Sequence, residues 1–200
     1  MLYDIRGYSD WVDSKMAKFS QRERFLSCVT GLFGEVGEYS DLFKKRRFHF
    51  TSVEPEKVLK ELGDILFYWF GCIRYCGMNV AKVFWFETWR ESQAHGTTVF
   101  REFTDDELVL QSGKWVGKIC EGADQVLKGL HFSDGGQVPA YMVYALQVTM
   151  NRLSATATRE GFTLQEVMEA NVRKLDARYP GGFDASRAHK PGETPIEERK

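Results

Sequence analysis

Several features that would narrow the function are lacking in this sequence. No apolar run is long enough to cross a membrane, and the N-terminus has no signal-peptide pattern. The formal net charge is −1, so we expect no general attraction to nucleic acid or to a membrane surface. The four cysteines form no C-x-x-C pair and the four histidines have no ligand spacing, which argues against zinc. We therefore expect a cytoplasmic protein that binds no membrane and has no stable contact with nucleic acid.

The alternation of period two that marks half-buried strands is also lacking. Apolar residues instead recur every three or four positions from Phe25 to Phe43 and from Val58 to Ile73. Capping boxes, in which a hydroxyl and a carboxylate satisfy the first free amides of a helix, are indicated by Ser20 with Glu23, Thr104 with Glu107, and Thr163 with Glu166. The predicted fold class is an all-α helical bundle.

Several helix landmarks recur at one interval of 84 residues, among them Ser20 and Thr104, Pro55 and Pro139, and Gly77 and Gly161. This interval predicts a degenerate tandem repeat of a helix–loop–helix–turn–helix unit. Repeat 1 spans about 19–95 and repeat 2 about 103–183, within a single domain of residues 1–188 followed by a flexible tail at 189–200. The apolar stripe of the first helix then maps onto Val109, Gly113, Val116, Cys120, Ala123 and Leu127. The alternative is a single domain with an insertion across roughly residues 84–140.

Two pairs of acidic residues have the spacing of neighbours on a helix face. Glu35 and Glu38 form the first pair, and Glu61 and Asp64 form the second. If the two helices pack along their apolar stripes, four carboxylates approach one another and repel unless a cation lies among them. Oxygen ligands suit Mg²⁺ or Mn²⁺. The simpler interpretation, two solvated helix faces, stays open on spacing alone.

The segments that carry these pairs also resemble a known family. "GLFGEVGEYSDLFKK" followed by "ELGDILFYW" resembles the MazG-like and dimeric dUTPase-like all-α nucleoside triphosphate pyrophosphatase superfamily, which is marked by Glu-x-x-Glu, a spacer, and Glu-x-x-Asp. "NVRKLDARYPGGF", residues 171–183, is similar to the segment that follows the metal helices in many of these proteins, including phage-encoded ones.

The resemblance implies an enzyme that hydrolyses a (d)NTP to the (d)NMP and diphosphate by metal-activated water attack. It implies that the catalytic metal ligands for Mg²⁺, with Mn²⁺ as a substitute, are Glu35, Glu38, Glu61 and Asp64. It also implies a homodimer or a homotetramer, in the host cytoplasm if the protein is phage-encoded. One alternative is a base-specialised enzyme, for dGTP in modified-base DNA synthesis or for dUTP or dCTP. An alternative of another class is a non-catalytic helical interaction protein.

Basic and aromatic side chains are the candidates for holding the nucleotide. Asn171, Lys174 and Arg178 share one face of the helix that Thr163 caps, and the resemblance places the Asn and the Lys near substrate. The complete substrate-binding prediction is Lys45, Tyr68, Asn171, Lys174, Arg178 and Tyr179. Lys45 has an alternative role at the helix dipole, and Tyr179 has one in packing. Gly31 is expected to leave room for metal or phosphate, and Gly34 and Gly37 to permit a close helix or subunit contact.

Overall fold

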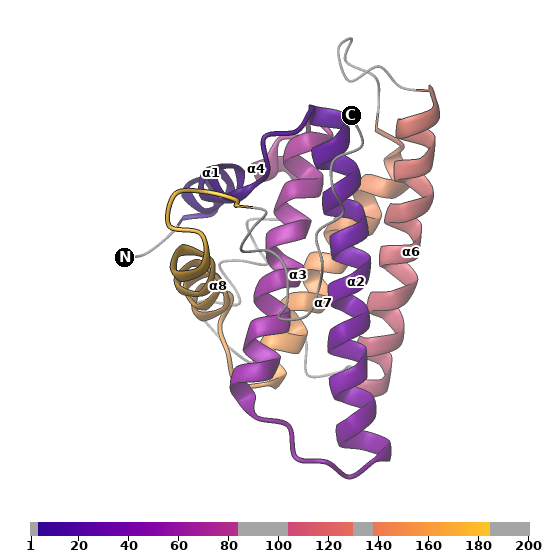
Figure 1. Cartoon of the computed structure of the whole chain (residues 1–200). Helices are drawn as coiled ribbons and strands as arrows, with labels where there is room; N and C mark the ends of the chain where they lie inside the picture. Colours follow the sequence, from indigo (N-terminus) through magenta and orange to yellow (C-terminus); the bar gives the residue numbers. More distant parts are fainter. Residues whose placement is uncertain (1–3, 84–103, 130–137, 185–200) are drawn as a thin grey trace, which may run out of the picture.

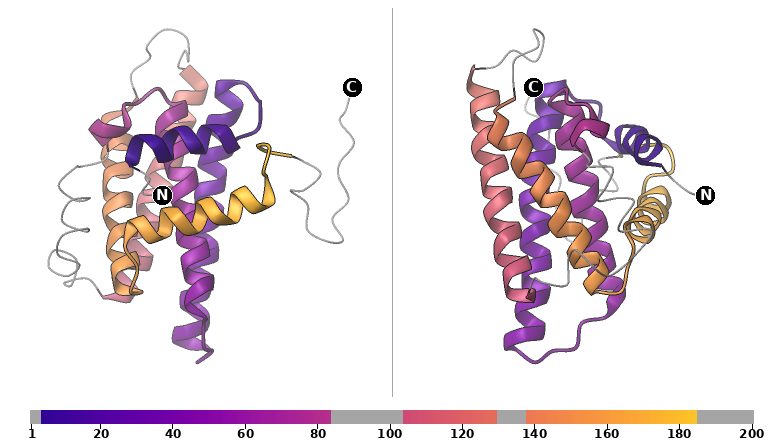
Figure 2. Two further views of the ribbon diagram at one scale, coloured as in Figure 1. Left: turned by 90° about the vertical axis from the view of Figure 1, so that its left-hand side faces the viewer. Right: turned by 180° about the vertical axis from the view of Figure 1, so that it is seen from behind.

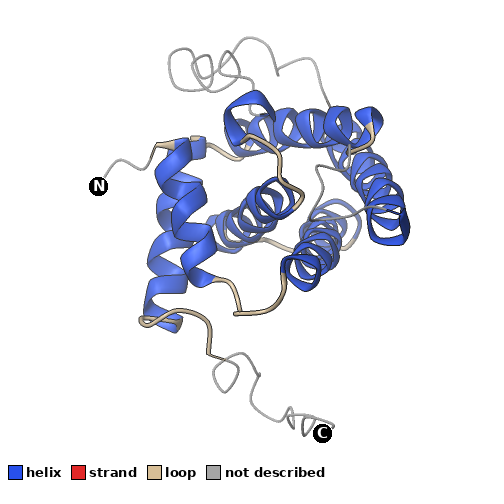
Figure 3. Cartoon of the chain, turned by 90° about the horizontal axis from the view of Figure 1, so that it is seen from above, coloured by secondary structure: helices blue, strands red, loops and turns tan. Residues whose placement is uncertain are grey.

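Four long helices form the body of the molecule (Figure 1). The computed structural model describes residues 4–83, 104–129 and 138–184, and within these ranges every regular element is a helix. The bundle helices are α2 (Gln21–Phe48), α3 (Pro55–Tyr75), α6 (Asp105–Gly129) and α7 (Ala140–Arg159). The predicted all-α class is confirmed, and Figure 3 shows the helices from above. Among the described helices, none is both long and apolar enough to cross a membrane.

The apolar stripes predicted for α2 and α3 are the inner faces of the bundle. Every residue of the α3 stripe is buried, and so is the α2 stripe except for Phe43, which is half-buried. The indole of Trp69 is fully buried, and its Nε1 donates a hydrogen bond to the backbone oxygen of Leu146 on α7 at 2.9 Å. Burial of side chains of this size supplies most of the stability of a helical bundle. The core therefore lies along α3, which packs against both α2 and α7.

The three predicted capping boxes are present. At the start of α2, Ser20 N donates to Glu23 Oε2 at 2.9 Å and Glu23 N donates to Ser20 Oγ at 3.3 Å. The same reciprocal bonds join Thr104 with Glu107 and Thr163 with Glu166. Pro55 begins α3, and Pro139 is the residue immediately before α7. Local sequence signals thus determine where these helices begin.

The tandem repeat stays a prediction, and one detail of it is wrong. On α6, Gly113 of the expected stripe is exposed, and the buried residues are Leu108, Val116, Ile119, Gly122, Ala123 and Val126. The interval between the caps is 84 residues. Three of the buried residues, Leu108, Ile119 and Val126, follow Phe25, Val36 and Phe43 of α2 at an interval one residue shorter. A shift of one residue turns a helix face by about 100°. Residues 84–103, which include the end of repeat 1, and the tail at 189–200 lie outside the described residues.

Two shorter helices lie across one side of the bundle. α1 (Ile5–Lys15) and α8 (Leu164–Arg178) run side by side over α3, as Figure 2 shows, and α4 (Val80–Val83) follows α3. On α1, the ring of Tyr8 packs edge-on against Phe70 of α3 with centroids 5.0 Å apart. The N-terminal helix and the C-terminal helix therefore meet on the face of α3 that carries Asp64.

Candidate metal and phosphate site

Three of the four predicted carboxylates form a cluster between α2 and α3. One carboxylate oxygen from each of Glu35, Glu38 and Glu61 lies within 4.8 Å of the others. Glu38 is exposed, Glu35 is half-buried, and Glu61 is only 7% exposed. The helical spacing of Glu35 and Glu38 on α2 places both toward α3, as the sequence predicted.

The Glu61 carboxylate is the least satisfied member of this cluster. Its Oε1 accepts a hydrogen bond from Lys60 Nζ at 2.9 Å. Its Oε2 is buried and has no hydrogen-bond partner among the described residues. A buried carboxylate oxygen without a partner is costly, and a cation is the usual means of satisfying it. The oxygen donors of this cluster fit Mg²⁺ or Mn²⁺, which keep part of their water shell beside protein carboxylates.

The pKa of Glu35 reflects the concentration of negative charge in the cluster. Burial, together with the charges of Asp64, Glu38 and Glu61, raises the pKa of its carboxyl to about 7, against the opposing charge of Lys174. Without a cation, the protein therefore relieves the repulsion by holding a proton on Glu35. Such a proton is released when a divalent ion occupies the cluster.

Asp64 lies next to the cluster but has its own partners on α8. Both of its carboxylate oxygens pair with Lys174 Nζ, and Asn171 Nδ2 donates to its Oδ1 at 3.0 Å. Asp64 is 8% exposed and Asn171 is 2% exposed, so these contacts are largely shielded from water. The structure thus brings Asn171 and Lys174 to the acidic site, and it places Asp64 beside the cluster of the three glutamates.

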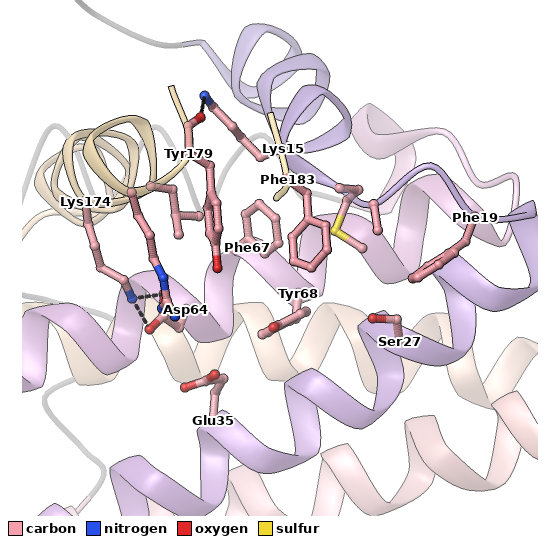
Figure 4. Close-up of a pocket in the computed structure, with 14 residues that line it drawn as sticks. Lys15, Phe19, Ser27, Glu35, Asp64, Phe67, Tyr68, Lys174, Tyr179 and Phe183 are labelled. Carbon is pink, nitrogen blue, oxygen red and sulfur yellow. Dashed lines mark hydrogen bonds and ion pairs between the residues drawn. The ribbon is translucent and has the colours of Figure 1, made fainter. Parts of the chain in front are cut away.

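A cavity of about 180 Å³ opens beside these residues (Figure 4). Glu35, Asp64 and Lys174 line one end of it. The rest is lined mainly by aromatic and apolar side chains, with basic groups at the edge: Lys15, Met16, Ala17, Phe19, Ser27, Phe67, Tyr68, Leu175, Arg178, Tyr179 and Phe183. An apolar cavity with charged groups at one end is suited to a ligand with a flat ring and an anionic group.

The aromatic and basic residues predicted on the C-terminal segment lie at this cavity. The Arg178 guanidinium stacks over the Tyr179 ring at 5.2 Å, and the rings of Tyr179 and Phe183 have centroids 5.5 Å apart. Tyr179 is 7% exposed, whereas Phe183 is 41% exposed. Both rings belong to the cavity wall, so their packing role and a ligand-covering role are compatible.

Tyr68 also lines the cavity, and its position explains one of the glycines of α2. A Cβ atom on Gly31 would lie 2.5 Å from Cε1 of the Tyr68 ring. The expectation that Gly31 leaves room for metal or phosphate is therefore wrong, because the Tyr68 ring fills that space. Gly34 and Gly37 have no atom within 4 Å of such a Cβ, so they permit no close helix contact among the described residues. The predicted subunit contact at these two glycines stays a prediction.

Lys45 is not brought to the cavity. Its Nζ pairs with Asp41 Oδ2 at 2.7 Å on α2, as expected of an i, i+4 pair on a helix surface. Lys45 comes ten residues after Glu35 on the same helix, which corresponds to about 15 Å along the axis. Its position near the C-terminus of α2 agrees with the helix-dipole interpretation.

Sequence reasoning missed the N-terminal contribution to the site. Lys15 lines the cavity, and its Nζ donates to the backbone oxygen of Tyr179 at 2.8 Å. Asp4 caps α1 by accepting a hydrogen bond from Gly7 N, and Tyr8, Val12 and Lys15 of this helix are buried. The sequence signal was available, because Tyr8, Val12 and Lys15 follow steps of four and three behind a capping Asp.

The chain was compared with family models, with curated proteins and with solved structures. None of the three comparisons gave a match. The resemblance to MazG-like pyrophosphatases therefore rests on the carboxylate spacing and on the segment at residues 171–183, and membership of that family stays a prediction.

Proposed function

We propose that this protein is a Mg²⁺-dependent nucleoside triphosphate pyrophosphohydrolase that converts a (d)NTP and water to the (d)NMP and diphosphate. The observation that carries the proposal is the buried Oε2 of Glu61, which has no hydrogen-bond partner in the described part of the chain and belongs to a cluster with Glu35 and Glu38. The adjoining cavity supports it, because it offers aromatic walls for a base and cations for phosphates. Free nucleotides in the cytoplasm are the proposed substrates, and a homodimer or homotetramer is the proposed assembly.

In this proposal each group of residues has a distinct task. Glu35, Glu38 and Glu61 form the metal cluster, Asp64 beside them is the fourth ligand expected from the resemblance, and Lys174 and Arg178 bind phosphate oxygens. The bound Mg²⁺ supplies charge neutralisation and lowers the pKa of a water molecule. One carboxylate of the site accepts the proton of the attacking water. The rings of Tyr68, Tyr179 and Phe183 exclude water and hold the base.

The experiment is a panel of the common NTPs and dNTPs with Mg²⁺ or with EDTA, with the products identified by ³¹P NMR. Diphosphate and a monophosphate are expected, and the panel identifies any specialisation for one base. Glu38→Gln and Asp64→Asn should abolish turnover while helical content is retained, and Glu56→Gln, an exposed change on α3, should not. Nucleotide binding without any product would favour the non-catalytic interaction protein, and release of orthophosphate would contradict the proposed bond cleavage.

A further inference from the structure

α1 carries three side chains that contact α8. The Tyr8 hydroxyl donates to Asn171 Oδ1 at 2.9 Å, and Trp11 Nε1 donates to Asp176 Oδ1 at 3.0 Å. Lys15 Nζ donates to the Tyr179 backbone oxygen and pairs with Asp176. Steps of three and four place these side chains on one face of α1. The N-terminal helix therefore contacts α8 along the length that carries Asn171, Lys174 and Arg178.

Among these three side chains, Tyr8 is connected to the acidic site through the side chain of Asn171. Its side chain is fully buried, and its hydroxyl binds the oxygen of the Asn171 amide. The nitrogen of the same amide donates to Asp64 Oδ1 at 3.0 Å. Burial, together with the charge of Asp64, raises the pKa of the Tyr8 hydroxyl well above its usual value. The hydroxyl thus stays protonated and acts as a donor.

This chain of hydrogen bonds determines how the Asn171 amide is oriented. An amide has one accepting end and one donating end, and rotation by half a turn would present its oxygen to the Asp64 carboxylate. The Asp64 carboxylate only accepts, so it selects the nitrogen, and the Tyr8 hydroxyl donates to the oxygen and holds the amide in that orientation. Gly63 permits the close approach of Asn171, because a Cβ on Gly63 would lie 3.0 Å from the Asn171 Cβ. Without the hydroxyl, the buried Asn171 oxygen loses its donor. The present orientation of the amide then becomes less stable.

We propose that Tyr8 is a positioning residue: its hydroxyl holds the Asn171 amide in the orientation that fixes the Asp64 carboxylate at the acidic site. Its effect on metal affinity rests on the proposed function, whereas the orientation of the amide does not. Removal of a group that hydrogen-bonds to a metal-binding carboxylate weakens metal affinity about 10–100-fold. Tyr8 does not contact Asp64 by a hydrogen bond of its own; its hydroxyl binds Asn171, and Asn171 binds Asp64.

The direct test is the exchange of the two Asn171 side-chain amide protons with solvent, measured by NMR and assigned from their loss in Asn171→Ala. In the unmodified protein they should exchange far more slowly than those of the exposed Asn79. Tyr8→Phe keeps the ring that packs against Phe70 and should speed the exchange about tenfold, the size expected for loss of one hydrogen bond. Exchange at Asn171 as fast as at Asn79 in the unmodified protein would overturn the proposal, whether or not the variant folds.

Tyr75→Phe is the matched control. The Tyr75 hydroxyl joins α3 to α1 by donating to Asp13 Oδ1 at 2.5 Å, and it does not bind α8. This variant loses the same chemical group and also weakens the attachment of α1. Because the Tyr75 hydroxyl does not contact Asn171, the exchange of the Asn171 amide protons should stay unchanged. Equal acceleration in both variants would show that general loosening of α1 is responsible and would overturn the role of Tyr8.

Mg²⁺ affinity, measured by titration calorimetry, is the second readout. Tyr8→Phe should weaken it about tenfold, and the same change made in Asn171→Ala should have no further effect, because the intermediary is gone. An equal loss in both backgrounds would contradict action through Asn171. If the unmodified protein hydrolyses no nucleotide, the proposed function fails, and the exchange experiment still decides the role of Tyr8.

Discussion

Lys174 on α8 pairs with both carboxylate oxygens of Asp64 on α3. The two side chains are 26% and 11% exposed, so the pair lies at the inner edge of the cavity. The positive charge of Lys174 offsets part of the negative charge of the acidic site before any ligand binds. Because Lys174 lines the cavity, it can also contact the phosphates of the proposed substrate. The pair therefore links the position of α8 to the charge of the site.

Replacement of Lys174 by methionine should raise KM for the nucleotide about tenfold or more, because a charge-assisted contact with phosphate is lost. The matched control is Arg173→Met. The Arg173 side chain is 69% exposed and lies 3.9 Å from Glu169, away from the cavity lining. Steady-state kinetics of the two variants provide the measurement, and equal KM values would contradict the assignment of Lys174.

Glu61→Gln should reduce turnover about 100-fold or more, since it removes a charge at the proposed metal and leaves the shape of the side chain unchanged. The free energy of unfolding should not fall, because the change removes a buried negative charge that is repelled by Glu35 and Glu38. Diphosphate release and urea denaturation measure the two effects. A variant that is inactive because it is unfolded would not support the metal assignment.

The raised pKa of Glu35 predicts a pH dependence of stability. Its folded value is about 7 and its ordinary value is 4.5, so the metal-free folded state holds more protons than the unfolded state in that interval. The free energy of unfolding in EDTA should therefore fall as pH rises through the interval. Mg²⁺ displaces this proton, so its stabilising effect should grow over the same interval.

Thermal unfolding with EDTA and with Mg²⁺, followed below and above that interval, measures this dependence. Glu35→Gln should flatten the pH profile in EDTA, because the side chain no longer titrates. A metal-free profile that rises with pH by the same amount in both proteins would show that other groups dominate.

Two glycines on α2 offer a matched test of packing. Gly31→Ala places a methyl group against the Tyr68 ring and should destabilise the fold by about 1–3 kcal/mol. Gly34→Ala adds the same methyl group in open space and should stabilise the helix by roughly 0.5–1 kcal/mol. Urea denaturation gives both values, and the prediction fails if the two changes have the same sign.

The proposed homo-oligomer predicts a particle mass of two or four times 23.0 kDa in sedimentation equilibrium. The outer face of α2 is apolar in part, since Phe33 is 64% exposed and Leu26 is 47% exposed. A mass of one chain over the whole concentration range would contradict the assembly.

The helix starts and the pairing of Glu35 with Glu38 were predictable because each depends on residues close in sequence. A capping box needs only Ser20 and Glu23, and the Glu35 and Glu38 pair needs only one helix turn. The partner of Gly31 was not predictable, because the direction of the Tyr68 ring depends on how α2 and α3 are rotated against each other. For the same reason the sequence could not separate Asp64 from the glutamates, since its partners Asn171 and Lys174 come from a distant helix.

The contact between Tyr8 and Asn171 also bears on the order in which the site is assembled. The two residues are 163 positions apart, so their hydrogen bond forms only after almost the whole described chain has left the ribosome. α2 and α3 are synthesised much earlier, and their carboxylates then lack the charge of Lys174. A nascent or truncated chain that ends before α8 therefore keeps Lys60 beside Glu61 and Asp64 but lacks Lys174, and α8 brings the second positive charge to Asp64.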